Sequence, residues 1–395
     1  MAVATGALAA TARELAPGLA ARGDEAVALR RLPDEQWRDL VDSGLLYALA
    51  PRWAGGGEVC AVDFVDAVFE VARAEPNTGW VYGVCGVHPY QLACFDPRAQ
   101  DEVWGGGLAD ASSALNPTGR AEEVEGGYRL SGRWSFSTGC DHCDWVVVGG
   151  LVGTVEVGGR RVRDLRSLLV PRSDYRIDPV WHTVGMAGTG SHDIVIEDAF
   201  VPAHRSQSHW SYRWGERLPG WERNPAAVYK LPFALMFGAA IVSATLGAAA
   251  GFLDAWTDIA STRIGSLGAG ADADNPFQRR RIAEARYELH SATDRLRANL
   301  AELEGMAEAE PERPLPDDLR ARCRFESCHG VQRVVAAVDQ LYAAASGRIV
   351  FVDHPLHRRY QDIKAAVGHV YLTDDAPALA YGAALLGRPV LEVGI

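Results

Sequence analysis

The hydrophobic pattern of this chain changes its period twice, and that change limits the folds available to it. Apolar residues recur at helical spacing over residues 1–108, alternate with polar residues over 109–224, and return to helical spacing over 225–395. These two periodicities are the main sequence signals for helices and for half-buried strands. Because the strands do not alternate with helices, a doubly wound parallel sheet is excluded. The sequence therefore predicts an α+β protein with an N-terminal helical domain, a small central β-domain and a C-terminal helical domain.

The C-terminal domain is predicted to be an antiparallel four-helix bundle. Four long segments with helical patterns are separated by short breaks, and they span residues 228–263, 275–309, 315–347 and 356–388. Long helices with short connections pack as antiparallel neighbours. In the first segment, residues 231–253 carry no charge and are long enough to cross a bilayer. Small residues dominate this stretch, which favours a helix buried in the bundle over a membrane span.

The central domain is predicted to be a small barrel or sandwich of short strands. Its clearest unit is the hairpin AEEVEGGYRLSGRWSFSTG, residues 121–139, in which a Glu-Gly-Gly turn joins two alternating segments. Further short strands are predicted in DWVVVGGLV, RSLLVPRSDY, YRIDPVW and HDIVIEDAFVP. In the N-terminal domain, the nearly apolar stretch NTGWVYGVCGVHPYQLACF, residues 77–95, predicts a buried helix.

The overall charge and the N-terminal sequence indicate which partners and which location to expect. The net charge of -12 over 395 residues argues against nucleic-acid binding and against an anionic membrane surface. The N-terminal stretch has no positive charge before its alanine-rich run, so it is a poor signal peptide. We expect a cytoplasmic protein.

The stretch RWSFSTGCDHCDW, residues 133–145, contains two cysteines at the spacing of a metal or redox motif. A structural zinc site usually needs a second such pair, and a redox dithiol opens a helix after a strand. Neither condition is met by Cys140 and Cys143, because the chain runs directly into another predicted strand. The total of seven cysteines is odd, which also disfavours a disulfide framework. We expect buried thiols and no metal, and His142 is a candidate for a pocket wall only.

A glycine-rich motif and several catalytic signatures can be set aside. GMAGTG, residues 185–190, resembles a dinucleotide-binding fingerprint, but it precedes a strand where that fingerprint must open a helix. The signatures of P-loops, HExxH zinc proteases and serine hydrolases do not occur in the sequence.

The order of the three parts, together with four phrases, resembles the acyl-CoA dehydrogenase superfamily. The phrases are GLLYALAPRWAGGG, EGGYRLSGRWSFSTG, GTGSHDIVIEDAFVP and HPLHRRYQDIKAA, and they occur in the family's order over almost the whole chain. Each phrase is weak alone, whereas the ordered set is specific. The resemblance implies the acyl-CoA dehydrogenase fold and a bound flavin.

The resemblance also implies that the segment WSFSTG lines the flavin. The hydroxyl of Ser137 falls where the family places a donor beside flavin N5, with Ser135 and Phe136 nearby. Without the flanking phrases, these serines would be read as one face of a strand.

Three residues match the family's contacts with the cofactor pyrophosphate. Arg263, late in the first bundle helix, matches an arginine that serves the cofactor of a neighbouring subunit, and a guanidinium suits phosphate. A solvated arginine at a helix end is the alternative. Ser346 and Gly347 occupy the place of the family's Gly-Gly pair.

The catalytic base of the dehydrogenases is missing. His369 and Val370 stand where a Tyr-Glu pair would supply the carboxylate, and valine cannot abstract a proton. Gln361 also replaces the arginine of the family's Arg-Asp pair. A histidine at this place resembles instead the two-component flavin monooxygenases of the same fold, called group D. Their second N-terminal buried helix also carries a histidine, matched here by His88.

This second resemblance implies a specific chemistry. Such enzymes receive reduced flavin from a separate NAD(P)H:flavin reductase, bind dioxygen as co-substrate and form a C4a-hydroperoxyflavin. We therefore expect a homotetrameric hydroxylase of an aromatic or polycyclic small molecule, in secondary metabolism, that uses reduced FAD in preference to reduced FMN. His88 and His369 would position the substrate or the hydroperoxide as base or hydrogen-bond partner, and Ser137 would act at N5. For each histidine, a satisfied core residue is the alternative.

Other readings of the whole chain stay open. One is an acyl-CoA dehydrogenase-like flavin oxidoreductase whose base lies elsewhere, with Asp374 and Asp375 as the nearest carboxylates. Another is a member of the same fold that oxygenates nitrogen or sulfur. A third is a non-catalytic helical scaffold, which flavin binding would distinguish from the others.

Overall fold

Helices form the first part of the chain, as predicted. The structure is a computed structural model that describes residues 6–157, 160–214, 217–263, 272–345 and 347–390. The N-terminal helices are α1 (Ala7–Ala21), α2 (Gly23–Leu29), α3 (Asp34–Asp42), α4 (Ala61–Ala74), α5 (Pro76–Gly86), α6 (His88–Ala93) and α7 (Pro97–Trp104). The apolar stretch 77–95 contains two of these helices, because α5 ends at Gly86 and α6 begins at His88. Pro89 lies in the first turn of α6, where a missing N–H is tolerated.

The central part contains two four-stranded sheets. The first has the order β1-β4-β5-β8 and the second has the order β2-β3-β7-β6. Their bounds are β1 (Ala111–Ala114), β2 (Arg120–Val124), β3 (Gly127–Ser137), β4 (Trp145–Val157), β5 (Arg160–Pro171), β6 (Arg176–Asp178), β7 (His192–Pro202) and β8 (Ser206–Ser208). β1 pairs with β4 in parallel, and the other described pairs are antiparallel. The predicted hairpin is confirmed as β2 and β3.

The two sheets share one apolar core. Alternating residues of β3, β4, β5 and β7 are buried together in it, including Leu130, Val148, Leu168 and Ile194. The indole N–H of Trp134 on β3 donates to the carbonyl of Gly149 on β4, 2.8 Å away, and so links the sheets. The arrangement is a sandwich.

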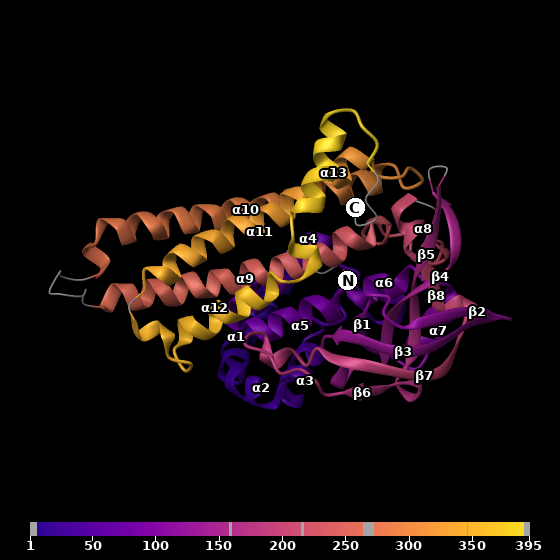
Figure 1. The fold of residues 1–395 in the computed structure, drawn as a ribbon, viewed down its shortest axis with the longest axis horizontal. Helices are drawn as coiled ribbons and strands as arrows, with labels where there is room; N and C mark the ends of the chain where they lie inside the picture. The colour runs from indigo at the N-terminus through magenta and orange to yellow at the C-terminus, as the bar shows by residue number, and fades with distance from the viewer. Residues whose placement is uncertain (1–5, 158–159, 215–216, 264–271, 346, 391–395) are drawn as a thin grey trace.

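Long helices follow the sheets and run side by side away from them (Figure 1). They are α9 (Phe233–Thr262), α10 (Pro276–Ala309), α11 (Asp317–Ala343) and α12 (Pro355–Ala366), preceded by the short α8 (His209–Trp214) and followed by α13 (Asp375–Leu385). α9 is long and apolar enough to span a membrane, but its most apolar stretch is entirely buried in the protein. Its neighbours include α4, α5, α10, α11 and α12. The prediction of a buried core helix over residues 231–253 is confirmed.

The fourth long helix, predicted over residues 356–388, is wrong as a continuous element. α12 ends at Ala366, a 3₁₀ turn follows at Val370–Leu372, and α13 then packs against α11. A local hydrogen bond stabilises the turn, since the side chain of His369 accepts a hydrogen bond from the backbone N–H of Tyr371. A side chain that bonds to nearby backbone competes with the helical pattern.

The GMAGTG motif joins three parts of the molecule. The N–H of Gly188 donates to Asn77 on α5, and the N–H of Met186 donates to Asp362 on α12. A Cβ atom on Gly185 would lie 2.1 Å from the carbonyl oxygen of Gln361, so only glycine allows this close approach. The motif therefore connects α5 and α12 to the start of β7, and it precedes a strand as the sequence indicated.

Candidate active site

Four aromatic or imidazole rings surround the ring of Phe237, which lies near the start of α9. The ring centroid of Phe237 lies 6.2 Å from that of His88, 5.9 Å from His369, 5.5 Å from Tyr371 and 5.5 Å from Phe233. We call these five residues the Phe237 cluster. The structure thus brings together the two histidines that are 281 positions apart in the sequence.

His88 is fully buried on α6 and has one ring nitrogen without a partner. Its Nδ1 lies 2.9 Å from Oε1 of Gln91, while Nε2 has no hydrogen-bond partner among the described residues. Burial lowers the pKa of His88 to about 4, so the imidazole is neutral at pH 7. Leaving a buried polar atom unpaired costs about 1–3 kcal/mol. A ligand that donates a hydrogen bond to Nε2 would recover this energy.

His369 is half-buried and lies on the 3₁₀ turn after α12. Its Nδ1 accepts the hydrogen bond of Tyr371 N–H, at 3.2 Å. A neutral imidazole has one donor and one acceptor nitrogen, so Nε2 carries the proton. Burial, and then the positive charge of Arg324, lower the pKa of His369 to about 4. The ring of Trp80 on α5 covers His369 edge-on, with the centroids 5.8 Å apart.

Arg324 on α11 is a buried cation beside the cluster, with only 4% of its surface exposed. Its Nη1 donates to the carbonyl of Tyr371 at 2.7 Å, and its guanidinium carbon lies 4.7 Å from the centre of the Tyr371 ring. Within the described ranges, no carboxylate lies within ion-pair distance of it. Gly238 makes room for this group, because a Cβ atom there would lie 3.0 Å from Nη1. A buried cation without a counter-ion is costly, and it favours an anionic or electron-rich ligand.

The WSFSTG segment contains a β-bulge that the alternating pattern did not predict. Trp134 pairs with Ile194 and Ser137 pairs with His192, so β3 holds one extra residue over this interval. The extra residue is Phe136. Its backbone lies in the left-handed region, at φ 70°, and 66% of its surface is exposed. Bulges of this kind redirect side chains and are common next to active sites.

The bulge separates the two serines and places an aromatic pair at the surface. Ser135 is half-exposed, whereas Ser137 is fully buried and donates to Oγ of Ser112 on β1, at 3.0 Å. The ring of Phe136 meets that of Trp181 edge-on at 6.1 Å. β1 also packs against α5 and α6, so Ser137 is connected to the helix that carries His88. Ser112 was not predicted, because its strand is too short for a periodic signal.

The residues predicted to contact the pyrophosphate lie at the far end of the long helices. Arg263 follows Phe237 by 26 positions, which corresponds to ~39 Å along α9. Arg263 forms an ion pair with Asp272. Gly347 is exposed and begins a 3₁₀ turn after α11. The indole N–H of Trp256 on α9 donates to the carbonyl of Leu341 on α11, so the ends of these two helices lie side by side. Ser346 lies outside the described residues.

Comparison with known proteins assigns the family. Residues 239–374 match the family model described as acyl-CoA dehydrogenase, C-terminal domain. The flavin-dependent monooxygenase oxygenase subunit HsaA of Rhodococcus jostii is 37% identical over 380 residues, covering 96% of this chain and 98% of that protein. The FADH(2)-dependent resorcinol hydroxylase, oxygenase component, of Rhizobium is 30% identical, covering 91% of this chain and 88% of that protein. The crystal structure of 3-HSA hydroxylase from Rhodococcus sp. RHA1 superposes with a TM-score of 0.89 at 36% identity, with 97% of each chain covered.

The chain belongs to the flavin-dependent monooxygenase oxygenase subunits with the acyl-CoA dehydrogenase fold. Both resemblances drawn from the sequence are thereby confirmed, and the chain is an enzyme of this class.

The carboxylates considered for a dehydrogenase base are placed elsewhere in this oxygenase subunit. Asp374 pairs with Nδ1 of His329 at 2.8 Å, and Asp375 is exposed at the start of α13. No ion pair or hydrogen bond connects either one to the Phe237 cluster in the described part of the chain.

The cysteine pair and its histidine have structural roles. Cys140 and Cys143 are buried and free, and burial raises the pKa of both thiols, so neither is a thiolate at neutral pH. His142 stacks on Trp37 of α3 at 4.8 Å and bonds to the carbonyl of Leu32. His142 thus holds the sheets against the N-terminal helices and does not line the Phe237 cluster. The described residues contain no group of histidine, cysteine or carboxylate side chains arranged to bind a metal ion.

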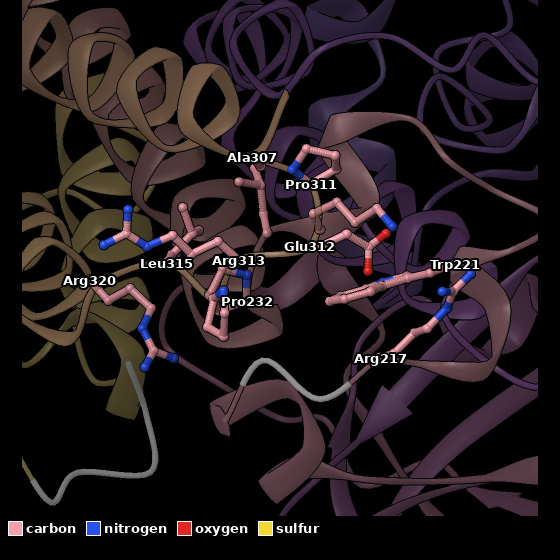
Figure 2. Close-up of a pocket in the computed structure, with 12 residues that line it drawn as sticks. Arg217, Trp221, Pro232, Ala307, Pro311, Glu312, Arg313, Leu315 and Arg320 are labelled. Carbon is pink, nitrogen blue, oxygen red and sulfur yellow. The ribbon is translucent and has the colours of Figure 1, made fainter. Parts of the chain in front are cut away.

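A surface cavity of about 120 Å³ lies between the start of α9 and the turn from α10 to α11 (Figure 2). Cations dominate its rim, but Arg313 pairs with Glu310 and Arg320 with Asp317. Burial lowers the pKa of Lys230, and the negative charge of Glu312 offsets this effect only in part. The cavity therefore has little unbalanced positive charge, and the Phe237 cluster remains the better candidate site.

The observed features fit a flavin beside the Phe237 cluster. The exposed ring of Phe136 and the half-buried ring of Trp181 offer an aromatic wall at a bulge, where backbone strain costs about 1–3 kcal/mol. Among the described residues, Nε2 of His88 has no hydrogen-bond partner and Arg324 has no carboxylate partner, and a bound ligand would satisfy both groups. Ser137 donates to Ser112, so its hydroxyl must turn away from that partner to reach a flavin.

Proposed function

We propose that this oxygenase subunit hydroxylates an aromatic small molecule, with dioxygen as co-substrate and reduced FAD delivered by a separate NAD(P)H:flavin reductase. The observation that carries the proposal is the buried, unpaired Nε2 of His88 in a cluster of aromatic rings. The name of the resorcinol hydroxylase, an oxygenase component that depends on FADH(2), supports the cofactor, the partner and the substrate class. Reduced FMN remains the alternative cofactor.

Reduced flavin, when bound, would supply two electrons to dioxygen, so that one oxygen atom of dioxygen enters the substrate and the other leaves as water. Ser135, Phe136, Ser137 and Trp181 would form the wall of its ring site. Arg263, with Ser346 and Gly347, would hold the phosphates of a flavin in a neighbouring subunit. An apolar cluster around the reacting atoms excludes water, which limits loss of the oxygen as hydrogen peroxide.

The two histidines would play opposite hydrogen-bonding roles toward the substrate, one as acceptor and the other as donor. Nε2 of His88 accepts, and so suits the hydroxyl group of a phenol, whereas Nε2 of His369 donates, and so suits an oxygen that gains negative charge. Because the pKa of His88 is about 4, His88 polarises the substrate hydroxyl as an acceptor and does not remove its proton in the ground state. The positive charge of Arg324 favours the electron-rich form of the substrate.

The assembly and the domain arrangement complete the proposal. The side chains of Val350, Phe351 and Val352 are 62–80% exposed at the end of the bundle, which supports burial against other subunits in a homotetramer. We assign domains to residues 1–108, 109–224 and 225–395, and a cytoplasmic location to the assembly.

A single-turnover experiment tests the proposed function. The protein is loaded with reduced FAD under nitrogen and mixed with ¹⁸O₂, with and without resorcinol and related phenols, while flavin absorbance, peroxide and products are measured. We expect a product that carries one ¹⁸O atom and less peroxide when the phenol is present. Release of all the oxygen as peroxide with every phenol, or bleaching of oxidised flavin by butyryl-CoA without oxygen, would contradict the proposal and favour a dehydrogenase-like oxidoreductase.

A further inference from the structure

A chain of hydrogen bonds leads from His88 into the sheets. Nδ1 of His88 lies 2.9 Å from Oε1 of Gln91, and Nε2 of Gln91 donates to Oγ of Ser167 at 3.0 Å. Oγ of Ser167 lies 2.9 Å from Nε2 of His209. His88, Gln91 and Ser167 are 0% exposed and His209 is 9% exposed. We call these four residues the His88 chain.

The fold brings these four residues together from three elements. His88 and Gln91 are three positions apart on α6, on one face of the helix. Ser167 lies on β5, where it pairs in register with Gln207 of β8, and His209 begins α8 directly after that strand. The ring of His209 contacts Phe233 edge-on at 5.6 Å, and Phe233 contacts Phe237. The His88 chain and the Phe237 cluster are therefore connected at both ends.

The orientation of the Gln91 amide decides whether Nε2 of His88 is a hydrogen-bond acceptor or a donor. With the amide oxygen of Gln91 facing His88, Nδ1 must carry the proton and Nε2 must be an acceptor. If the amide turned over, its nitrogen would donate to Nδ1 and His88 would become a donor at Nε2. Gln91 alone does not fix the orientation of its amide, since the side chain has both an acceptor oxygen and a donor nitrogen. Ser167 also has a donor and an acceptor, so the choice passes to the neutral ring of His209. When Nε2 of His209 accepts the hydroxyl proton of Ser167, Ser167 can only accept from the amide nitrogen of Gln91, which gives the first orientation.

We propose that Gln91, Ser167 and His209 are positioning residues that hold His88 in the tautomer with its proton on Nδ1. In the second orientation of the amide, both His88 and His369 would be donors toward the cluster, and a substrate hydroxyl would find no acceptor there. The catalytic consequence rests on the proposed function, whereas the proton positions do not. No residue of the His88 chain other than His88 was singled out by the sequence, because the contacts join α6 to β5 and to α8, about 75 and 120 residues later.

Neutron diffraction from crystals of the deuterium-exchanged, full-length protein at pH 7 tests the proton positions directly. We expect deuterium on Nδ1 of His88 and none on Nε2, with the amide nitrogen of Gln91 facing Ser167. Deuterium on Nε2 of His88, alone or together with Nδ1, would overturn the proposal. This measurement needs neither flavin nor substrate.

Two substitutions test the consequence for activity. Ser167→Ala removes the middle link, and His209→Phe removes the far nitrogen while keeping a ring against Phe233. We expect both to lower the yield of hydroxylated resorcinol by about three- to tenfold, the effect of losing one ordering hydrogen bond. The affinity for reduced FAD should not change, and the neutron map of Ser167→Ala should show deuterium shared between the two nitrogens of His88.

Ser243→Ala is the matched control, because Ser243 is equally buried and donates to the backbone of Val65, away from any histidine. We expect it to lose as much thermal stability as Ser167→Ala without losing hydroxylation. Equal hydroxylation by Ser167→Ala and Ser243→Ala would overturn the positioning role. If the wild-type protein hydroxylates no phenol, the proposed function fails, and the neutron map still decides the orientation of the His88 chain.

Discussion

At the scale of single residues, the neutrality of the two histidines is the property on which the chemistry depends. An imidazole that is already charged can only donate, so a difference between acceptor and donor exists only for neutral rings. Burial keeps both rings neutral, because it disfavours the charged form. Hydrogen bonds to Gln91 and to the backbone of Tyr371 then give the two rings opposite characters.

This neutrality predicts an unusual pH dependence. The pKa values of His88 and His369 are lowered to about 4, so the neutral forms are lost only as the pH falls toward that value. We expect the product yield per turnover to be constant from pH 6 to pH 8 and to fall below about pH 5. Single-turnover yields measured across this range check the prediction. An apparent pKa near 6.5 would mean that water reaches the histidines.

Replacing either histidine should affect hydroxylation far more than flavin binding. His88→Ala and His369→Ala should each lower the hydroxylation rate by roughly two orders of magnitude or more, the usual effect of losing an acid–base group. The dissociation constant of reduced FAD should change little, because neither residue is assigned to the phosphates. His290→Ala, at an exposed position on α10, is the control. Normal hydroxylation by both variants would remove the Phe237 cluster from the mechanism.

At the scale of secondary structure, the bulge in β3 exposes an aromatic ring and lowers the stability of the folded state. Phe136 is held at φ 70°, which strains every residue except glycine. Phe136→Gly should therefore leave the melting temperature unchanged or higher, while it weakens the binding of reduced FAD because the aromatic wall is lost. Phe136→Ala keeps the strain and loses the ring, so it should weaken binding without the gain in stability. Calorimetry and flavin titration of the two variants provide the comparison, and unchanged flavin affinity in both would show that the flavin lies elsewhere.

The outcome of sequence reasoning also differs between elements. Long segments with steady periodicity, such as α9, α10 and the hairpin of β2 and β3, were predicted closely, because many residues contribute to each pattern. β1 and β8 were missed, since strands of four and three residues contain too little alternation. The break after α12 was missed because the turn that follows it is capped by a single side chain, His369, which leaves no periodic signal.

The candidate site shows the same limit. His88 and His369 could be selected from sequence only through family resemblance, because their proximity depends on α6 and the end of α12 meeting at Phe237. Four further residues could not be selected from the sequence, because each is recognised only by its hydrogen bond to a residue on another element. They are Ser112, Gln91, Ser167 and His209.

At the scale of the whole molecule, a buried carboxyl couples the junction of α5, α12 and the GMAGTG motif to pH. Burial, and then the nearby Glu75, raise the pKa of Asp362 to about 7. The folded state therefore holds the proton more tightly than the unfolded chain, whose aspartates titrate near 3.9. The stability that comes from the protonated form is present at low pH and is lost as the pH rises from about 4 to 7.

Asp362→Asn should remove this dependence, because an amide still accepts the hydrogen bond of Met186 N–H and cannot ionise. We expect the variant to gain melting temperature relative to wild type as the pH rises from 5 to 8, by roughly 2–4 °C. Asp353→Asn, at an exposed position, should show no such trend. Scanning calorimetry at several pH values makes the comparison, and parallel curves for wild type and Asp362→Asn would contradict the raised pKa.

The length of α9 bears on the proposal that Arg263 holds the flavin of a neighbouring subunit. Because Arg263 lies ~39 Å along the helix from Phe237, one subunit cannot place both residues on the same flavin. If Arg263 serves a neighbour, then Arg263→Ala and His88→Ala damage different halves of each site. Tetramers assembled from equal amounts of the two inactive variants should recover about a quarter of wild-type hydroxylation, since one site in four receives both intact residues. Co-expression with two affinity tags isolates the mixed tetramers. No recovery in them, or a monomer by light scattering at micromolar concentration, would show that each subunit holds its flavin without Arg263 of another.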